Sequence, residues 1–243
     1  TFSAEDKTLK ITDNGLGMTA GEVEEYINRI AFSGATDFLE KYKDKSNEDQ
    51  IIGHFGLGFY SAFMVADRVT IDTLSFEKDA KAVRWVSEDG MEYEISDSDK
   101  TGRGTVITLV LSEEAQKIFD TATLRMTLRK YCSFIPADLY FVDTKSDRLH
   151  MENEEKKKKE AQEKGETYEI KEVSYAPMNN KEPLWIKKPS ECTDEDYKQF
   201  YHSVFNDGKD PLFWIHLNMD YPFNLKGILY FPKINMEYES IEG

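Results

Sequence analysis

The spacing of hydrophobic and polar residues predicts a strand and an amphipathic helix at the start of the chain. Residues 9–12, Leu-Lys-Ile-Thr, alternate between apolar and polar, which is typical of a strand with one buried face. The strand is expected to end at Asp13. Thr19 and Glu22 have capping-box spacing and predict the start of a helix. The core face of this helix carries apolar residues three or four positions apart: Val23, Tyr26, Ile27 and Ile30.

The pattern predicts further helices and strands up to residue 146. Strands are expected at Val69–Leu74, Val83–Val86, Met91–Ile95 and Gly104–Leu111, the middle two as a hairpin around Asp89-Gly90. Helices are expected from Gly34 to about Tyr42, from Leu57 to about Ala66, after a Ser112 cap, and along Leu124, Leu128, Tyr131 and Ile135. Leu139–Val142 is expected to complete the unit. These elements predict an α+β fold, a two-layer α/β sandwich with helices on one face of a mainly antiparallel sheet.

The composition changes after this first region. From Met151 to about Glu172 the chain is dominated by Glu and Lys. We interpret residues 147–177 as a charged linker, either a solvated helix or a mobile segment, between a first domain at 1–146 and a second at 178–243. The second region predicts the beginning of another α/β domain, with a helix capped by Thr193 and strands at Phe213–Leu217 and Gly227–Phe231.

The bulk composition restricts the classes of partner. The 243 residues carry a net charge of -15, which disfavours nucleic acid and anionic membranes as partners. No apolar stretch approaches the roughly 20 residues that span a bilayer, so a soluble protein is expected. Cys132 and Cys192 form no CxxC pair, which favours buried free thiols in a reducing compartment, the cytoplasm. The four histidines lack metal-ligand spacing, so no metal site is expected. Because the chain begins Thr-Phe-Ser-Ala, its natural start is expected to lie upstream.

Three glycine-bearing segments carry the candidate chemistry. Asp13-Asn14-Gly15-Leu16-Gly17-Met18 places a carboxylate after a strand, where it can accept a hydrogen bond from an adenine amino group. The glycines let the backbone approach a flat ring, and Met18 can supply an apolar wall. The third segment, Gly104-Thr105, begins a predicted strand. The Thr105 hydroxyl is available to a base or an ordered water.

The second segment, Gly53-His54-Phe55-Gly56-Leu57-Gly58, runs into a predicted helix near Phe59. Free backbone N–H groups at a glycine-rich helix start can hold phosphates. It is not a Walker A loop, because Phe59-Tyr60 stand where Lys-Ser/Thr would be required.

Together and in this order, the three segments resemble the ATPases shared by gyrases, sensor histidine kinases, MutL-type repair proteins and heat-shock chaperones. Within this superfamily, the sequence most resembles the ninety-kilodalton heat-shock chaperones, in particular their bacterial branch. The segments that carry this resemblance are Ile11–Thr19, Ile30–Gly34 and Ile52–Asp67. The resemblance extends into the second region, to Trp185–Pro232. It implies the Bergerat-type ATPase fold, without its N-terminal helix and strand, followed by an incomplete middle domain.

The resemblance also implies roles for individual residues. Asp13 would bind the adenine amino group, Gly17 and Thr105 would help through water, and Met18 would line the base. The backbone of Gly53, His54, Phe55, Gly56, Leu57, Gly58 and Phe59 would hold the phosphates. Ser33 and Gly34 would begin a mobile lid. The implied parent is a cytoplasmic, homodimeric stress-response chaperone that binds ATP or ADP with Mg²⁺ and couples hydrolysis to remodelling of unfolded or client proteins.

Three departures limit what the resemblance implies. Phe32 stands where the family has a basic residue before the Ser-Gly of the lid, although Arg29 is close in sequence. The family's catalytic glutamate and magnesium-binding asparagine lie on a helix upstream of the aspartate, and only twelve residues precede Asp13 here. Its phosphate-sensing arginine and dimerisation domain would lie beyond Gly243. We therefore expect this chain to lack catalytic residues and to hydrolyse ATP negligibly.

Three alternatives remain open from the sequence. Gly15-x-Gly17-x-x-Ala20 matches the fingerprint of dinucleotide-binding oxidoreductases. A DNA-linked ATPase of the same superfamily is a second alternative, against which the net charge of -15 speaks. A holdase that binds clients through exposed apolar surface is a third.

Overall fold

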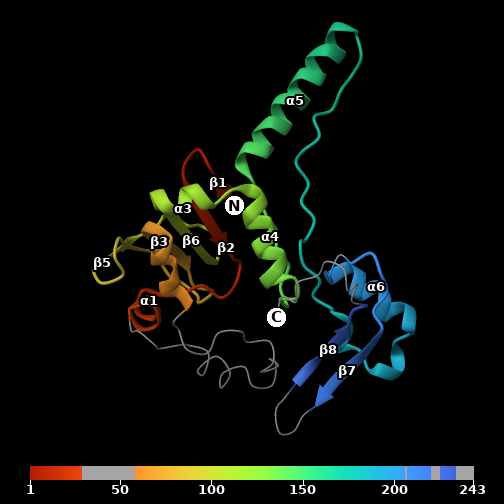
Figure 1. Ribbon diagram of the computed structural model, residues 1–243. Helices are drawn as coiled ribbons and strands as arrows, with labels where there is room; N and C mark the ends of the chain where they lie inside the picture. Colours follow the sequence, from red (N-terminus) through yellow and green to blue (C-terminus); the bar gives the residue numbers. More distant parts are fainter. Residues whose placement is uncertain (29–57, 206, 220–224, 234–243) are drawn as a thin grey trace. The chain divides into compact units, whose positions relative to one another are not determined.

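The chain forms two compact units in the computed structural model, which describes residues 1–28, 58–205, 207–219 and 225–233 (Figure 1). The first unit comprises residues 1–132 and 139–178, and the second comprises residues 133–138 and 179–243.

The first unit is built around a six-stranded sheet with the strand order β1-β2-β6-β3-β4-β5. Every neighbouring pair in this sheet is antiparallel. The last of these six strands in the sequence, β6, lies between β2 and β3 (Figure 1). The strands are β1 (Phe2–Ser3), β2 (Thr8–Thr12), β3 (Ala66–Leu74), β4 (Val83–Ser87), β5 (Tyr93–Asp97) and β6 (Gly104–Leu111).

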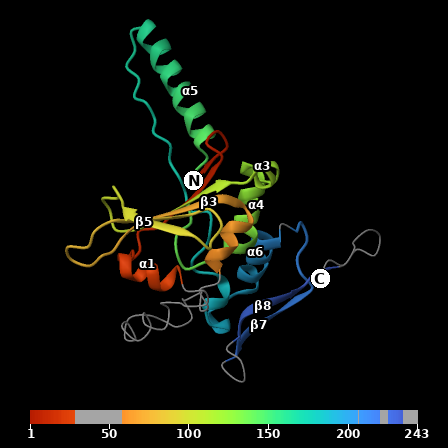
Figure 2. The same ribbon diagram turned by 90° about the vertical axis from the view of Figure 1, so that its left-hand side faces the viewer.

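One face of this sheet is buried, and helices cover it. Side chains alternate along a strand, and those of Val69, Ile71 and Trp85 on the covered face are almost completely buried. Burial of such a side chain contributes about 1.5–3 kcal/mol to folding. Helices α1 (Ala20–Tyr26), α3 (Glu113–Ile118) and α4 (Thr121–Cys132) lie beside the sheet (Figure 2). Each of them adds one buried residue to the same core. The predicted two-layer α/β sandwich is confirmed.

The opposite face of the sheet is not buried and carries polar residues beside Val86, Val106 and Val110. In β2, β3 and β6 it carries Lys10, Thr70, Asp72 and Thr108, none of which is buried. The alternation of apolar and polar residues in these strands therefore follows directly from one covered and one open face.

Two predicted helix caps are confirmed. The Thr19 hydroxyl accepts a hydrogen bond from the Glu22 N–H at 3.3 Å, and the Glu22 carboxylate accepts one from the Thr19 N–H at 2.7 Å. The Ser112 hydroxyl accepts a hydrogen bond from the Ala115 N–H at 3.2 Å and starts α3. These contacts satisfy N–H groups that have no partner inside the helix.

Several predicted boundaries are wrong; β3, for example, begins at Ala66 rather than Val69. The apolar helix expected from Leu57 to Ala66 is a 3₁₀ helix, η2 (Gly58–Met64), and Leu57 lies outside the described residues. It stops there because Ala66 already pairs with Leu111 in the sheet. The hairpin strand expected to begin at Met91 begins at Tyr93, because the Asp89 carboxylate accepts hydrogen bonds from the N–H groups of Met91 and Glu92 and keeps them in the turn.

The predictions for residues 131–142 are also partly wrong. Tyr131 was expected in the core but is 70% exposed, and α4 ends at Cys132, before Ile135. Residues 139–142 form no strand; the Phe2 N–H donates to the Val142 carbonyl oxygen at 2.8 Å, and a single parallel bridge joins Phe2 to Asp143. Since β1 has only two residues, it offers no edge for a longer pairing. The two cysteines are free and half-buried rather than buried.

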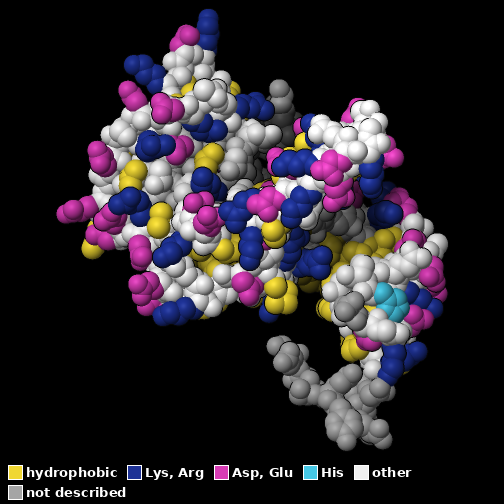
Figure 3. All heavy atoms as spheres, turned by 90° about the horizontal axis from the view of Figure 1, so that it is seen from above, with side chains coloured by type: hydrophobic (Ala, Val, Ile, Leu, Met, Phe, Trp, Pro, Cys, Tyr) yellow, Lys and Arg dark blue, Asp and Glu magenta, His cyan; other side chains and the backbone are white. Residues whose placement is uncertain are grey.

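Acidic and basic side chains are interspersed on the one face of the molecule that Figure 3 shows as spheres. Figure 3 shows both signs mixed on the face that it presents, without a large area of one sign. In the described ranges, no helix has the length and apolar character needed to cross a membrane.

The segment predicted as a charged linker contains a long helix within the first unit. Helix α5 (Thr144–Glu163) is capped at its N-terminus by Asp143, whose carboxylate accepts a hydrogen bond from the Lys145 N–H at 3.1 Å. After Gly165 the chain runs back beside the helix, and His150 Nε2 contacts the Lys171 carbonyl oxygen at 2.9 Å. Of the two predicted alternatives, the helix is confirmed for residues up to Glu163.

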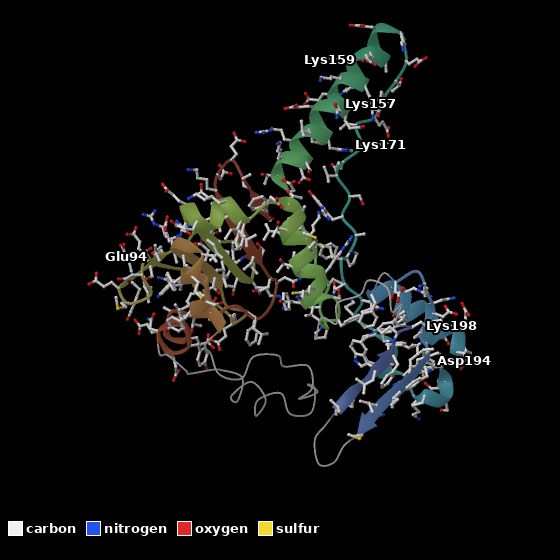
Figure 4. The ribbon with its side chains drawn as sticks, in the orientation of Figure 1. Glu94, Lys157, Lys159, Lys171, Asp194 and Lys198 are labelled. Atoms are coloured by element: carbon white, nitrogen blue, oxygen red, sulfur yellow. The ribbon has the colours of Figure 1, made fainter. Side chains whose placement is uncertain are left out.

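A buried carboxylate joins α5 to the returning segment. Glu154 is 2% exposed, and its two oxygens accept hydrogen bonds from Lys157 Nζ at 2.7 Å, the Tyr168 hydroxyl at 2.9 Å and the Lys171 N–H at 3.0 Å. Figure 4 labels Lys157 on the helix and Lys171 on the returning segment. The Lys157 hydrogen bond, followed by that of the Lys171 N–H, lowers the pKa of Glu154 from its ordinary 4.5 to about 2.

The second unit packs one helix on a hairpin. Helix α6 (Asp194–Phe205) follows the predicted Thr193 cap, whose hydroxyl accepts from the Asp196 N–H at 3.2 Å. The Tyr197 ring stacks on Trp214 at 5.0 Å between centroids. The predicted strands are confirmed as the antiparallel pair β7 (Phe213–Met219) and β8 (Leu225–Phe231), with two short 3₁₀ helices before α6, η3 (Leu184–Ile186) and η4 (Pro189–Glu191).

Candidate functional site

The aspartate of the first glycine segment lies where three strands of the first unit meet. Asp13 follows the last residue of β2, and its N–H donates to the Thr105 carbonyl oxygen at 2.9 Å. Its carboxylate oxygen Oδ1 accepts hydrogen bonds from the Gly15 N–H at 2.8 Å and the Thr105 N–H at 3.2 Å. Two N–H groups therefore fix the orientation of this carboxylate.

The other carboxylate oxygen is available to a ligand. Asp13 is exposed, and its Oδ2 has no hydrogen-bond partner among the residues that the structure describes. An ionised carboxylate is a pure acceptor and forms stronger hydrogen bonds than a neutral group. The site therefore presents a fixed, charged acceptor, which suits an exocyclic amino group.

Close packing against β3 and β6 requires the glycines around Asp13. At Gly17 the backbone has φ +67°, and a Cβ there would lie 1.9 Å from the Leu74 carbonyl oxygen. At Gly104 φ is +102°, and a Cβ would lie 2.2 Å from the Asp13 carbonyl oxygen. The sequence interpretation gave Gly17 a role in approach to a ring; the structure shows that the ends of the strands already need glycine here.

The predicted site residues Met18 and Thr105 lie together around a residue that the sequence analysis missed. The hydroxyl of Thr73, near the end of β3, accepts a hydrogen bond from the Met18 N–H at 2.9 Å and lies 3.1 Å from the Thr105 hydroxyl. The Met18 side chain is half-buried against the core. A signal for Thr73 was present, because it is a polar residue at a core position of a strand whose other core positions are Val69 and Ile71.

The predicted phosphate loop lies mostly outside the described residues. The site predictions at Ser33, Gly34, Gly53, His54, Phe55, Gly56 and Leu57 fall there, as do Arg29 and Phe32. Gly58 begins η2, and the Phe59 ring packs edge-to-face on Trp85 at 5.6 Å between centroids. Phe59 thus anchors this segment to the core, and its role towards a phosphate remains a prediction.

The acidic residue of the α1 capping box, Glu22, is already hydrogen-bonded. Glu22 is used by the capping box, where its Oε2 accepts hydrogen bonds from both the N–H and the hydroxyl of Thr19. In the described part of the chain, no three His, Cys, Asp or Glu side chains are grouped so that they could hold a metal ion. Among the described residues around the turn, the Asp13 carboxylate is therefore the candidate acceptor for a ligand.

The sheet contradicts the dinucleotide-binding alternative. The G-x-G-x-x-G fingerprint binds pyrophosphate between parallel strands of a βαβ unit, whereas the strand that precedes Gly15 pairs antiparallel with both of its neighbours. The Leu16 carbonyl oxygen also accepts from the Phe76 N–H at 2.7 Å, which ties the turn to the end of β3.

Comparison with known proteins matches both parts of the chain to one family. The family model described as histidine kinase-, DNA gyrase B- and HSP90-like ATPase matches residues 2–104, and the model described as Hsp90 protein matches residues 118–242.

Several bacterial proteins are similar over nearly the whole chain. The chaperone protein HtpG of Bacteroides thetaiotaomicron is 47% identical over 232 residues, which cover 96% of this chain and 31% of that protein. HtpG of Porphyromonas gingivalis is 46% identical over 228 residues, 94% of this chain and 31% of that protein. HtpG of Shigella flexneri is 38% identical over 233 residues, 95% of this chain and 34% of that protein. The chain thus spans about a third of the length of these curated relatives. With an ATPase-like sheet followed by a region that matches the Hsp90 model, the chain belongs to the Hsp90 family.

Proposed function

We propose that this chain binds adenine nucleotides, ATP or ADP, at the Asp13 turn, as part of an ATP-dependent chaperone. The observation that carries the proposal is the exposed Asp13 carboxylate: two N–H groups hold its Oδ1 in place, and its Oδ2 has no partner among the described residues. The match of residues 2–104 to an ATPase family model supports the same reading.

The chemistry of the carboxylate favours adenine over guanine. Adenine carries an amino group at the position where guanine carries a carbonyl oxygen, and an ionised carboxylate accepts from the first and repels the second. A hydrogen bond to a charged group is worth about 1.5–3 kcal/mol. The half-buried Met18 side chain, beside the turn, would give the base an apolar surface.

The phosphates and the metal belong to other parts of the proposed site. The backbone of Gly53–Phe59 remains our proposal for the phosphate-binding segment, with Ser33 and Gly34 at the start of a lid. Mg²⁺, when bound with ATP, would neutralise phosphate charge. We propose that its ligand and the general base for hydrolysis come from an upstream segment of the parent protein, so that this chain alone has negligible turnover.

The activity of the whole protein is part of the proposal. The relatives are named chaperones, and they are about three times as long as this chain. We propose that the parent is a cytoplasmic homodimer that remodels unfolded or client proteins, with residues 1–146 as its nucleotide-binding domain, 147–177 as a linker and 178–243 as the beginning of a middle domain.

Calorimetric titration with ADP tests the nucleotide site. In Asp13→Asn, Oδ1 can still accept from the N–H groups of Gly15 and Thr105, but an NH₂ group replaces Oδ2 and faces the adenine amino group. We expect ADP affinity to fall roughly 10- to 150-fold, the equivalent of about 1.5–3 kcal/mol.

A matched control lies in the turn between β4 and β5. Asp89 Oδ1 also accepts two backbone N–H groups, from Met91 at 2.8 Å and Glu92 at 3.0 Å. Asp89→Asn is expected to leave ADP binding unchanged. Equal ADP affinity of Asp13→Asn and the unmodified chain would remove Asp13 from the site. Tighter binding of NADH than of ADP would restore the dinucleotide alternative.

A further inference from the structure

Thr73 is a fully buried polar residue that the proposed function does not yet use. Its exposed fraction is 0%, and it lies on the covered face of β3, in line with Val69 and Ile71. Its hydroxyl oxygen contacts three polar groups: the Met18 N–H at 2.9 Å, the Thr105 hydroxyl at 3.1 Å and the Gly104 carbonyl oxygen at 3.4 Å.

These three contacts use the full hydrogen-bonding capacity of a hydroxyl group, which has one proton and two acceptor lone pairs. The Met18 N–H can only donate, and the Gly104 carbonyl oxygen can only accept. All three contacts are therefore made together when Thr73 accepts from Met18 and Thr105 and donates to Gly104. Loss of this one hydroxyl would leave two buried backbone groups without this partner.

The three partners of Thr73 lie at the end of the aspartate turn and on the strand beside its beginning. Met18 ends the turn just before the α1 cap. Gly104 and Thr105 are the first two residues of β6, and the Thr105 N–H donates to Oδ1 of Asp13 at 3.2 Å. The Thr73 hydroxyl thus ties the far end of the turn to the residue that orients the carboxylate.

We propose that Thr73 is a positioning residue for adenine recognition. It contacts no ligand itself; it holds Met18 and Thr105 in register, so that the Asp13 acceptor is oriented before the nucleotide binds. A preorganised acceptor discriminates between bases better than one that must be ordered on binding. This inference rests on the proposed nucleotide site at Asp13.

Thr73→Val tests the proposal, because valine keeps the shape of the side chain and removes the hydroxyl. Thr73→Ser keeps the hydroxyl. Thr70→Val makes the same change on the open face of β3, away from the turn. The first readout needs no nucleotide: amide hydrogen exchange of Met18 should be faster in Thr73→Val and unchanged in the other two variants.

The second readout is base selectivity, the ratio of the dissociation constants for IDP and ADP. IDP replaces the amino group with a carbonyl oxygen, so this ratio reports the orientation of Asp13. In Thr73→Val we expect ADP binding to weaken about tenfold, as for loss of one buried hydrogen bond, and the ratio to fall by a similar factor. Thr73→Ser should stay within about twofold of the unmodified chain. A purely structural role would lower thermal stability without changing this ratio.

The outcomes separate this inference from the proposed function. If Asp13→Asn abolishes selectivity and Thr73→Val leaves it unchanged, the nucleotide site stands and the role of Thr73 is wrong. If the unmodified chain does not distinguish ADP from IDP, the proposed function itself is wrong. Should Thr73→Val fail to fold, Thr73→Ala removes the same hydroxyl with a smaller side chain, and unchanged selectivity in that variant would overturn the proposal.

Discussion

Gly17 combines two constraints that no other residue type satisfies. Its φ of +67° lies in the left-handed region, where a Cβ is strained, and that Cβ would stand 1.9 Å from the Leu74 carbonyl oxygen. The backbone strain and the clash both disfavour any other residue at this position. The clash could be relieved only if the turn moved away from the end of β3. Gly17 is thus needed to build the site even before any nucleotide is considered.

Gly17→Ala is therefore expected to destabilise the first unit by about 2 kcal/mol or more, from backbone strain and the clash. Gly21 provides the control: it lies in α1, and a Cβ there would meet nothing within 4 Å. Gly21→Ala should leave stability unchanged or raise it by up to about 1 kcal/mol, the difference in helix propensity. Urea unfolding followed by circular dichroism measures both. A Gly17→Ala variant as stable as Gly21→Ala would contradict the packing described here.

Among the elements, α5 shows how a sequence full of charges can still form fixed structure. Most of its charged side chains are exposed, but Glu154 is buried and bonded to Lys157, Tyr168 and the Lys171 N–H. A buried carboxylate is tolerated only when its oxygens are satisfied. The returning segment after Gly165 supplies two of the three donors, so helix and segment stabilise each other.

This arrangement predicts a pH dependence with a definite sign. The folded pKa of Glu154, about 2, lies below its ordinary value of 4.5, so the unfolded chain binds the proton more readily. The contribution of Glu154 is complete above about pH 5 and is lost as the pH falls from about 4.5 to 2. Glu154→Gln should lower the thermal midpoint near neutral pH, and its difference from the unmodified chain should shrink across that acid range. The exposed neighbour Glu155→Gln should show neither effect; a difference for Glu154→Gln that is constant with pH would be against this assignment.

The strands show what the sequence could predict. Gly104–Leu111 is rich in β-branched residues (Thr105, Val106, Ile107, Thr108 and Val110), and β6 has the predicted bounds. Ala66–Arg68, in contrast, carries no strand pattern of its own. These residues join β3 because Ala66 and Arg68 pair with Leu111 and Val110, a long-range contact that local periodicity does not contain.

The candidate site was predictable to a similar degree. The order of the glycine segments pointed to Asp13, Gly17, Met18 and Thr105, and the structure brings these four together. Thr73 was missed because a single threonine in a strand is unremarkable until its partners are known. The packing of Gly17 on Leu74 could not be predicted either, because it depends on where β3 ends relative to the turn.

At the scale of the whole molecule, the charge disfavours DNA as a partner. The net charge is -15, and Figure 3 shows acidic and basic side chains interspersed, with no extended basic area, on the face that it presents. DNA binding depends on Lys and Arg groups that neutralise successive phosphates. The interspersed charge offers no such track on this face.

We therefore expect no binding of duplex DNA at about 150 mM salt, within roughly the range where non-specific DNA-binding proteins still bind. Fluorescence anisotropy of a labelled duplex measures this, with a second titration at low salt to expose weak electrostatic attraction. Saturable binding at the higher salt, with affinity that falls as salt rises, would restore the DNA-linked alternative.

The position of β6 between β2 and β3 has a consequence for the order of events during synthesis. The N–H of Thr105 and the carboxylate of Asp13 are 92 residues apart in the chain. Strands β2 and β3 do not pair with each other; both pair with β6. A growing chain that has not yet reached Gly104 contains the entire aspartate motif but lacks β6, which supplies the Thr105 contacts that orient Asp13. Nucleotide therefore cannot guide the early steps of folding; it can only select and hold the sheet once its central strand has been inserted.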